Sequence, residues 1–461
     1  MKINTHSALY GTLVLTLSNI LLQILGFVYR VFIARLIGAE GMGLFSLVMP
    51  AYSVIMSLAA SGLTVAVSHL TAGYQALGHT RAAAQLVRRA LGVFLVLFFA
   101  VTAIVAPLSD GISVWLLGDA RTRAGLLFLL PCILFTGLEN IHKSHFYGLK
   151  KIHQPAASEL IEMTVRTGAV ILLLTMLKPA HEEPAVALII LGMVICEITS
   201  ASLLRVMYRH EQAHVLPSGP TLPLRPMLRE ISRIAVPIAM ANLLANLIGA
   251  ANSVMIPSRL VTSGMTPAAA LSAYGVVTGM SMPLLSLPYA FIAALTLVMI
   301  PRLSEDLTLG RTTALRRRTT RTLTATTLAI IPSMALLVIF GPRLALLLFK
   351  HEAAGAHFPL LALGALMSCY QGIMGSLLSG LGKQGKTAAN MTAAGLLQLA
   401  LTWFLTAQPL LRLRGFIFAF VISSFAGAVL CALDLYRFFG IAMRKNQPHS
   451  TRTTRQNKVT S

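Results

Sequence analysis

Apolar residues are gathered into long runs that are separated by short polar segments. A membrane-crossing helix needs about 20 mainly apolar residues, because about 30 Å of hydrocarbon must be crossed and every backbone polar group must be satisfied within the segment. The chain offers twelve such runs, at residues 7–29, 43–70, 90–108, 124–147, 157–177, 185–207, 234–256, 272–300, 323–340, 358–381, 387–405 and 415–436. This pattern predicts an all-α polytopic membrane protein. The first run is too long for a signal-peptide core, so we expect it to remain as the first helix.

The longest polar stretch between apolar runs lies near the middle of the chain and is rich in proline and glycine. Such a composition is typical of a linker. We therefore expect a six-helix lobe over residues 1–208, a basic cytoplasmic linker over 209–233, and a second six-helix lobe over 234–437. The polar, basic residues 438–461 predict a disordered cytoplasmic tail.

The first and seventh predicted helices carry matching polar stripes. Asn19 and Gln23 follow one another at helical spacing in the first, and Asn242 and Asn246 do so in the seventh, with Asn252 beside that stripe. Parallel repeats of this kind are typical of transporters whose substrate site lies between two lobes that rock about it. We predict two pseudo-symmetric lobes, a binding cleft lined by both stripes, and alternating access. The alternative is that the stripes only hydrogen-bond neighbouring helices.

Composition excludes a soluble enzyme. Of the 461 residues 56% are hydrophobic and only 11% are charged, whereas about a quarter of a soluble chain is charged. Most of the 37 lysine and arginine residues fall in alternate loops on the side of the N-terminus. The positive-inside rule then places both termini in the cytoplasm. The net charge of +22 is thus a signal of topology and not of nucleic-acid binding.

No motif predicts catalysis, a metal centre or a cofactor. The four cysteines, Cys132, Cys196, Cys369 and Cys431, are too widely separated for a zinc site or a disulfide framework. Residues 380–387 match the phosphate-loop pattern, but they join two apolar runs, whereas that motif requires a preceding β-strand. We expect a protein that is not an enzyme.

Arg30 ends the polar stripe of the first helix. Charged groups inside a membrane are costly and are candidates for function. The planar guanidinium can hold two phosphate oxygens at once, so Arg30 is a candidate for contacting an anionic substrate. The alternative is that it extends to the membrane interface. Arg259, which corresponds to Arg35 in the repeat, is a weaker candidate.

Acidic residues also fall within the predicted helices. Glu162 and Arg166 have the favourable i,i+4 order for an ion pair in the fifth helix, while Glu139 lies in the fourth and Glu197 in the sixth. These side chains either bind a coupling sodium ion or proton, or form a structural ion pair. Coupling to the membrane potential is a further alternative.

Residues 25–39, which read LGFVYRVFIARLIGA and are followed by EGMGLF, resemble the first-helix signature of stage V sporulation protein B and the related lipid II flippases. These belong to the multidrug/oligosaccharidyl-lipid/polysaccharide exporter superfamily. Residues 147–151, 255–260 and 283–305 agree with the same family. The resemblance extends over nearly the whole chain.

The resemblance implies a multi-pass flippase of the bacterial inner membrane. It would move an undecaprenyl-pyrophosphate-linked saccharide from the inner to the outer leaflet for peptidoglycan, spore cortex or polysaccharide synthesis. Arg30 matches the arginine that lines the cationic cavity in such flippases. The implied partners are the lipid-linked saccharide and membrane lipids, with cell-wall synthesis enzymes as further candidates and no nucleic acid. The alternative is a drug/cation antiporter of the same superfamily, whose cavity should be acidic.

Overall fold

The computed structural model describes residues 8–445, with side chains described for 18–289, 299–300 and 302–440. Over this range the chain is helical and has no β-strand. The elements in order are α1 (Ala8–Met56), η1 (Ser57–Ser61), α2 (Gly62–Ala76), α3 (Thr80–Val105), α4 (Ser109–Gly111), η2 (Ile112–Leu116), α5 (Thr122–Gly148), α6 (His153–Leu177), α7 (Glu182–His214), α8 (Leu224–Thr262), α9 (Pro267–Gly275), η3 (Val276–Ser281), α10 (Met282–Leu285), α11 (Tyr289–Thr308), α12 (Thr312–Phe349), η4 (Glu352–Gly355), α13 (Phe358–Gly380), α14 (Gln384–Leu405) and α15 (Leu413–Lys445). This confirms the predicted fold class.

The long first helix is two membrane crossings. The apolar stretch Ser18–Ala76 has 59 residues and would be roughly 90 Å long if straight, about three times the hydrocarbon thickness. It is broken at Gly38, whose φ of 70° and ψ of −171° lie outside the helical region. Residues with a β-carbon avoid that conformation. Eleven candidate spans lie in the described part of the chain, and the first contains two crossings, so the predicted twelve are present.

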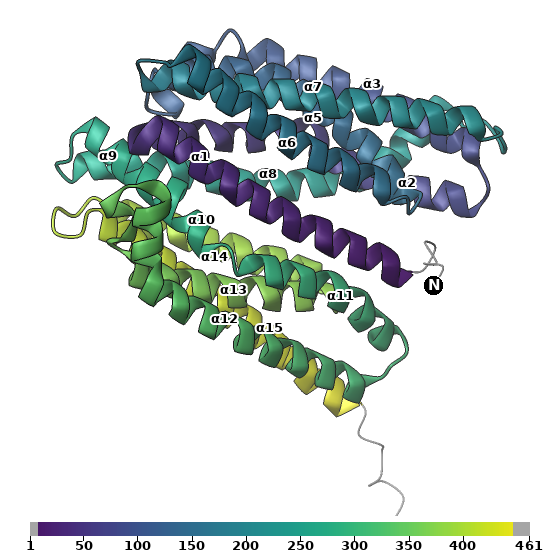
Figure 1. Cartoon of the computed structure of the whole chain (residues 1–461). Coiled ribbons are helices and arrows are strands. Elements are labelled where there is room, and N and C mark those ends of the chain that lie inside the picture. Colours follow the sequence, from purple (N-terminus) through teal and green to yellow (C-terminus); the bar gives the residue numbers. More distant parts are fainter. Residues whose placement is uncertain (1–7, 446–461) are drawn as a thin grey trace, which may run out of the picture.

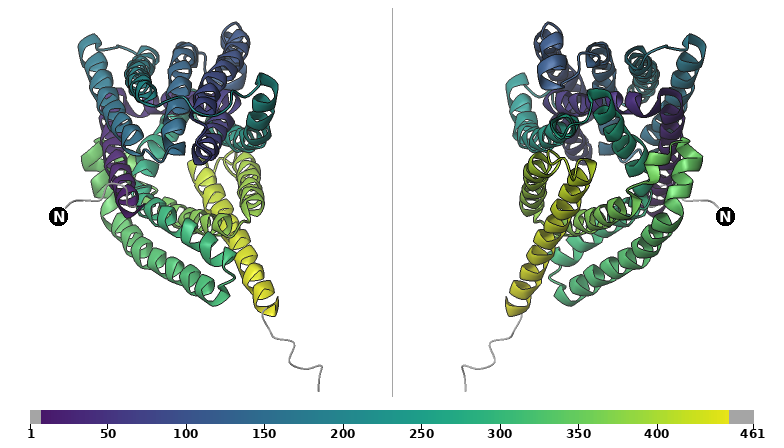
Figure 2. Two further views of the ribbon diagram at one scale, coloured as in Figure 1. Left: turned by 90° about the vertical axis from the view of Figure 1, so that its right-hand side faces the viewer. Right: turned by 90° about the vertical axis from the view of Figure 1, so that its left-hand side faces the viewer.

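The helices form two groups. In Figure 1 the helices from α1 to α7 occupy the upper part of the molecule and those from α10 to α15 the lower part, and Figure 2 shows the same division from both sides. α8 and α9 lie along the boundary, where α8 packs against both α2 and α14 and α9 packs against α1. The described ends of α1 and α15 lie on the same side in Figure 1, as an even number of crossings requires.

Two π-helical segments occupy equivalent places in the two halves. η1 interrupts the second crossing and packs against α8, while η3 interrupts the eighth and packs against α1. Each segment therefore faces the first helix of the opposite lobe. The eighth crossing, predicted as one helix over 272–300, is also broken at residues 286–288, where Pro288 lacks the N–H that a continuous helix would use. η1 and η3 therefore repeat in the two halves, as the polar stripes of the first and seventh helices do.

The segment between the lobes is shorter than the predicted linker. Only residues 215–223 are non-helical, because α7 continues to His214 and α8 begins at Leu224. This segment is fixed to α3 by Arg89, whose guanidinium donates to the carbonyl oxygens of Leu222 at 2.8 Å and Pro223 at 2.9 Å. At the other end, α15 includes residues 438–445 of the predicted tail, and 446–461 lie outside the described residues.

A glycine seam joins the lobes at the end of the bundle opposite the termini. A β-carbon on Gly43 would lie 2.2 Å from the carbonyl oxygen of Leu271, and one on Gly275 would lie 2.0 Å from that of Ala39. Neither position can accept a β-carbon without movement of the backbone. The two crossings that hold these glycines therefore approach as closely as backbones can, and the lobes are closed at this end.

An arginine adds a polar contact at the same end. The Arg35 guanidinium donates from Nη2 to the carbonyl oxygen of Leu347 at 2.7 Å and from Nε to that of Leu348. These carbonyls belong to the last turn of α12, where helical hydrogen-bond partners are missing and the helix dipole favours a cation. Arg35 thus links the first lobe to a helix end of the second.

Substituting Gly275 with alanine should open this seam. The added β-carbon would overlap the carbonyl oxygen of Ala39, so we expect a lower Tm and a longer distance between spin labels at His181 and Glu352. Gly92→Ala is the matched control, because a β-carbon there meets nothing within 4 Å and alanine favours helix by about 0.5–1 kcal/mol over glycine. An unchanged label distance in Gly275→Ala would show that the seam does not hold the lobes together.

Candidate functional site

A large cavity lies between α1 and the second lobe. Its volume is about 860 Å³, and Asn19, Gln23 and Arg30 of α1 line it. The opposite wall includes Ser286 before α11 and Tyr289 at its start, together with residues of α13 and α15. The polar stripe of the first helix therefore lines a cavity between the lobes. From the sequence we had predicted a cleft between the lobes for this stripe.

Arg30 gives this cavity its charge. It is the one formally charged side chain in the lining, which contains no carboxylate. No ion-pair partner of Arg30 is found in the described part of the chain. Apolar side chains such as Leu285, Leu361 and Phe420 make up much of the remaining wall. A positive group beside an apolar surface suits a ligand that carries both a negative charge and a hydrocarbon part.

The polar stripe of the seventh helix lines a different cavity. Asn242 and Asn246 of α8 line a space of about 560 Å³ bounded by α2, η1, α5 and α6. The Asn246 amide Nδ2 donates to Ser57 Oγ at 2.6 Å, and Lys143 and Glu159 lie in the same wall. We had expected both stripes to line one cleft. The structure gives each stripe its own cavity, because each faces helices of the opposite lobe.

Two of the predicted substrate ligands line neither of these cavities. The Asn252 amide donates back to the Ile248 carbonyl of its own helix at 3.3 Å. The Arg259 Cζ atom lies 2.9 Å from the centroid of the Trp403 ring on α14. A guanidinium is attracted to the face of an indole, and this contact places Arg259 against α14 and not in the cavity that holds Arg30. The predicted binding roles of Asn252 and Arg259 therefore gain no support from their positions.

A buried charged network lies behind the second cavity. Lys143 Nζ lies 2.6 Å from Glu139 Oε1, 3.5 Å from Glu159 Oε1 and 3.2 Å from Glu162 Oε2. Glu139 is only 1% exposed and also accepts a hydrogen bond from Ser200 Oγ at 2.5 Å. The network therefore connects α5, α6 and α7, the fourth to sixth crossings, through charged side chains.

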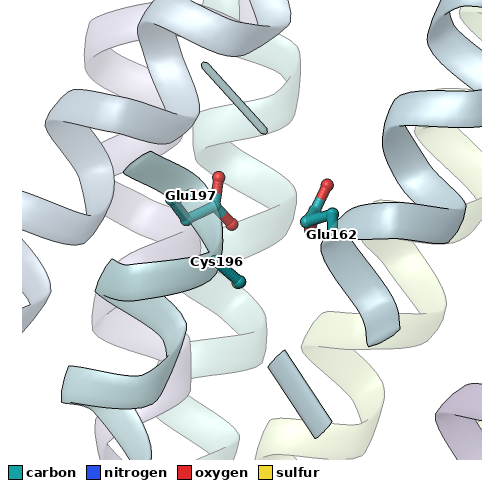
Figure 3. Close-up of side chains that lie close together, drawn as sticks. All are labelled: Glu162, Cys196 and Glu197. Atoms are coloured by element: carbon teal, nitrogen blue, oxygen red, sulfur yellow. The ribbon is translucent and has the colours of Figure 1, made fainter. Parts of the chain in front are cut away.

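Arg166 is the second cation of this network. Figure 3 shows Glu162 on α6 facing Cys196 and Glu197 on α7, and their ligand atoms lie within 4.8 Å of one another, close enough to hold a metal ion. The Arg166 guanidinium, however, pairs with Glu162, lies 3.2 Å from Glu197 Oε1 and donates to Cys196 Sγ at 3.3 Å. A built-in cation thus occupies the place that a bound ion would take.

The sequence interpretation missed the role of Lys143. We counted it as a basic residue near the cytoplasmic side, although it falls inside the predicted fourth helix. Its i,i+4 spacing from Glu139 was the signal that could have identified it, since side chains four residues apart lie on the same helix face. The network therefore contains two cations, Lys143 and Arg166. They pair with four carboxylates, those of Glu139, Glu159, Glu162 and Glu197.

Comparison with known proteins agrees with this architecture. The profile of the polysaccharide biosynthesis protein family matches residues 8–306. The chain belongs to this family. Stage V sporulation protein B of Bacillus subtilis (strain 168) is 25% identical over 441 residues, which cover 95% of this chain and 85% of that protein. Lipid II flippase MurJ of the same strain is 23% identical, over 72% of this chain and 64% of that protein.

The fold is shared with solved transporters of the same superfamily. An inward-facing multidrug resistance MATE family transporter of the MOP superfamily matches with a TM-score of 0.76 at 14% identity, over 92% of this chain and 96% of that one. This family member is therefore a multi-span membrane protein of the transporter and flippase superfamily. At this identity the structural likeness concerns the fold alone.

Proposed function

We propose that this member of the polysaccharide biosynthesis family moves an undecaprenyl-pyrophosphate-linked saccharide from the inner to the outer leaflet of the bacterial cell membrane. The observation that carries the proposal is the lining of the cavity between α1 and the second lobe, where Arg30 is the one charged group among the described residues. A guanidinium favours phosphate oxygens because it can donate two parallel hydrogen bonds. The polar Asn19 and Gln23 suit sugar hydroxyls, and the apolar wall suits the lipid carrier.

The transport cycle that fits this arrangement is alternating access. The seam of Gly43 and Gly275 closes one end of the lobe boundary, and rocking about that boundary would expose the Arg30 cavity to each leaflet in turn. Both termini then lie in the cytoplasm. The similarity to a stage V sporulation protein and to a lipid II flippase supports a role in spore cortex, peptidoglycan or polysaccharide synthesis. The alternatives for the energy source of transport are a sodium gradient, a proton gradient and the membrane potential. Cell-wall synthesis enzymes are candidate partners.

A drug/cation antiporter is the second candidate function. The observation that favours it is the excess of carboxylates in the network behind the second cavity, where Glu159 lines the wall beside Lys143. A cationic drug would be attracted to such a site. The likeness to a MATE family transporter supports the same alternative.

The experiment that separates the two functions uses the purified protein in liposomes. A fluorescent undecaprenyl-pyrophosphate-linked saccharide is placed in both leaflets, and its translocation is followed by the additional fluorescence that an impermeant external quencher removes as molecules of the inner leaflet reach the outer one. Parallel vesicles contain ethidium under a proton or sodium gradient. We expect translocation of the lipid-linked saccharide and no ethidium movement. Ethidium movement without saccharide translocation would replace the flippase proposal by the antiporter.

A further inference from the structure

The outer face of α12 carries a shallow groove near the end of the molecule where both chain termini lie (Figure 1). Its volume is about 620 Å³. The lining residues recur at helical spacing on one face of α12, and they are Thr313, Arg316, Arg317, Thr320, Arg321, Thr324, Ala325 and Leu328. Along this face Thr320 lies between Arg317 and Arg321, and Thr324 and Leu328 follow, so the groove combines guanidinium groups, hydroxyl groups and an apolar end.

The charge on this face is not neutralised by acidic neighbours. Arg317 and Arg321 are exposed, and neither has an acidic partner among the residues whose side chains are described. Arg318 behaves differently, since its Nε lies 2.9 Å from Oδ2 of Asp306, which is 1% exposed. Arg318 on the inner side of α12 therefore supports packing, while Arg317 and Arg321 of the groove are available to an external anion.

The apolar part of the face continues along the membrane-crossing length of α12. Leu328 is 71% exposed, and further along the helix Leu336 is 56% and Ile339 is 66% exposed. Because α12 is long and apolar enough to cross a membrane, these side chains lie where acyl chains would contact them. Thr324 lies between Arg321 and Leu328 along the helix, as the ester groups of a phospholipid lie between its phosphate and its acyl chains. This order of side chains matches the order of groups along a phospholipid.

We propose that this groove binds an anionic phospholipid of the leaflet nearest the chain termini, with its phosphate between Arg317 and Arg321 and an acyl chain along Leu328. The site is separate from the Arg30 cavity, because no residue of α12 lines that cavity. The bound lipid is thus a component of the second lobe and not the transported molecule. The general excess of basic residues on this side does not account for the groove, because it does not require the arginines to share one face with hydroxyl and apolar side chains.

The test is binding of phosphatidylglycerol to the purified full-length protein in phosphatidylcholine nanodiscs, measured by native mass spectrometry over a range of lipid fractions. Each arginine near a membrane surface contributes appreciably to anionic lipid binding, so we expect Arg317→Gln/Arg321→Gln to bind phosphatidylglycerol about tenfold to thirtyfold more weakly. The matched control is Arg81→Gln/Arg88→Gln, which removes two exposed charges from α3 outside the groove, and it should bind as the unaltered protein does. Equal affinity in the groove variant would overturn the proposal.

Two further measurements keep the result decisive. A photo-crosslinker at position 328, with the groove arginines intact, should label phosphatidylglycerol several-fold more than phosphatidylcholine, and equal labelling would overturn the proposal without any arginine substitution. Soluble glycerol phosphate at millimolar concentration should not displace the lipid. Displacement would show that the arginines recognise a free phosphate rather than a lipid.

Discussion

Replacing Arg30 with glutamine is expected to reduce translocation of an undecaprenyl-pyrophosphate-linked saccharide by about 100-fold or more in reconstituted vesicles. Truncating one partner of a desolvated charge pair costs about 2–5 kcal/mol, and Arg30 is the one charged side chain that the described cavity lining offers to a phosphate. The protein itself should fold normally, because no ion pair within the described residues depends on Arg30. Flipping is measured by quencher accessibility, and folding by Tm and gel filtration.

Arg30→Lys distinguishes charge from geometry. Lysine keeps the positive charge but cannot form the parallel pair of hydrogen bonds that a guanidinium makes with phosphate, so we expect activity between that of Arg30→Gln and the unaltered protein. Arg88→Gln serves as the control, since Arg88 is exposed on α3 and lines neither cavity described above. Full flipping activity in Arg30→Gln would remove the basis for the proposed function.

Replacing Lys143 with methionine is expected to lower the free energy of unfolding by about 3–5 kcal/mol, which is the usual cost of removing one member of a buried ion pair. Lys143 is 8% exposed and lies between Glu139, Glu159 and Glu162, so its loss leaves carboxylates crowded without a counter-charge. The measurement is thermal unfolding of the purified protein in detergent, with circular dichroism to confirm the helical content.

Two variants make this result interpretable. Lys151→Met removes a lysine whose side chain is 49% exposed and pairs with Glu211 at 2.9 Å, and exposed ion pairs contribute only about 0–1 kcal/mol. The double variant Lys143→Met/Glu139→Gln should recover part of the lost stability, because it removes one of the uncompensated charges. Equal Tm values for Lys143→Met and Lys151→Met would mean that the buried network does not stabilise the first lobe.

The sequence predicts those features that depend on local rules. Hydrocarbon thickness sets the length of an apolar run, so the number of crossings could be counted from the chain. The i,i+4 rule likewise predicts the pairing of Glu162 with Arg166, because both lie on one helix. The runs 7–29 and 43–70 predicted two crossings, but not that the single residue Gly38 divides them, because glycine occurs both in continuous membrane helices and at their ends.

Contacts between different helices could not be predicted from these local rules. Glu197 had no local partner in the sequence, and its partner Arg166 comes from a different helix whose rotation only packing determines. Arg35 and Arg259 occupy matching places in the repeat, yet Arg35 donates to a carbonyl oxygen at the end of α12 whereas Arg259 lies against the ring of Trp403. A repeated sequence pattern therefore predicts equivalent positions, but not equivalent surroundings.

The contact of Arg35 with the end of α12 has a consequence for how readily the lobes part. The donors are on an exposed side chain, and the accepting carbonyls of Leu347 and Leu348 would be hydrated as soon as they are released. A hydrogen bond from a charged group contributes about 1.5–3 kcal/mol, and access of water lowers that value. The two hydrogen bonds of Arg35 therefore favour one relative orientation of the lobes, by a free energy small enough for the lobes still to separate.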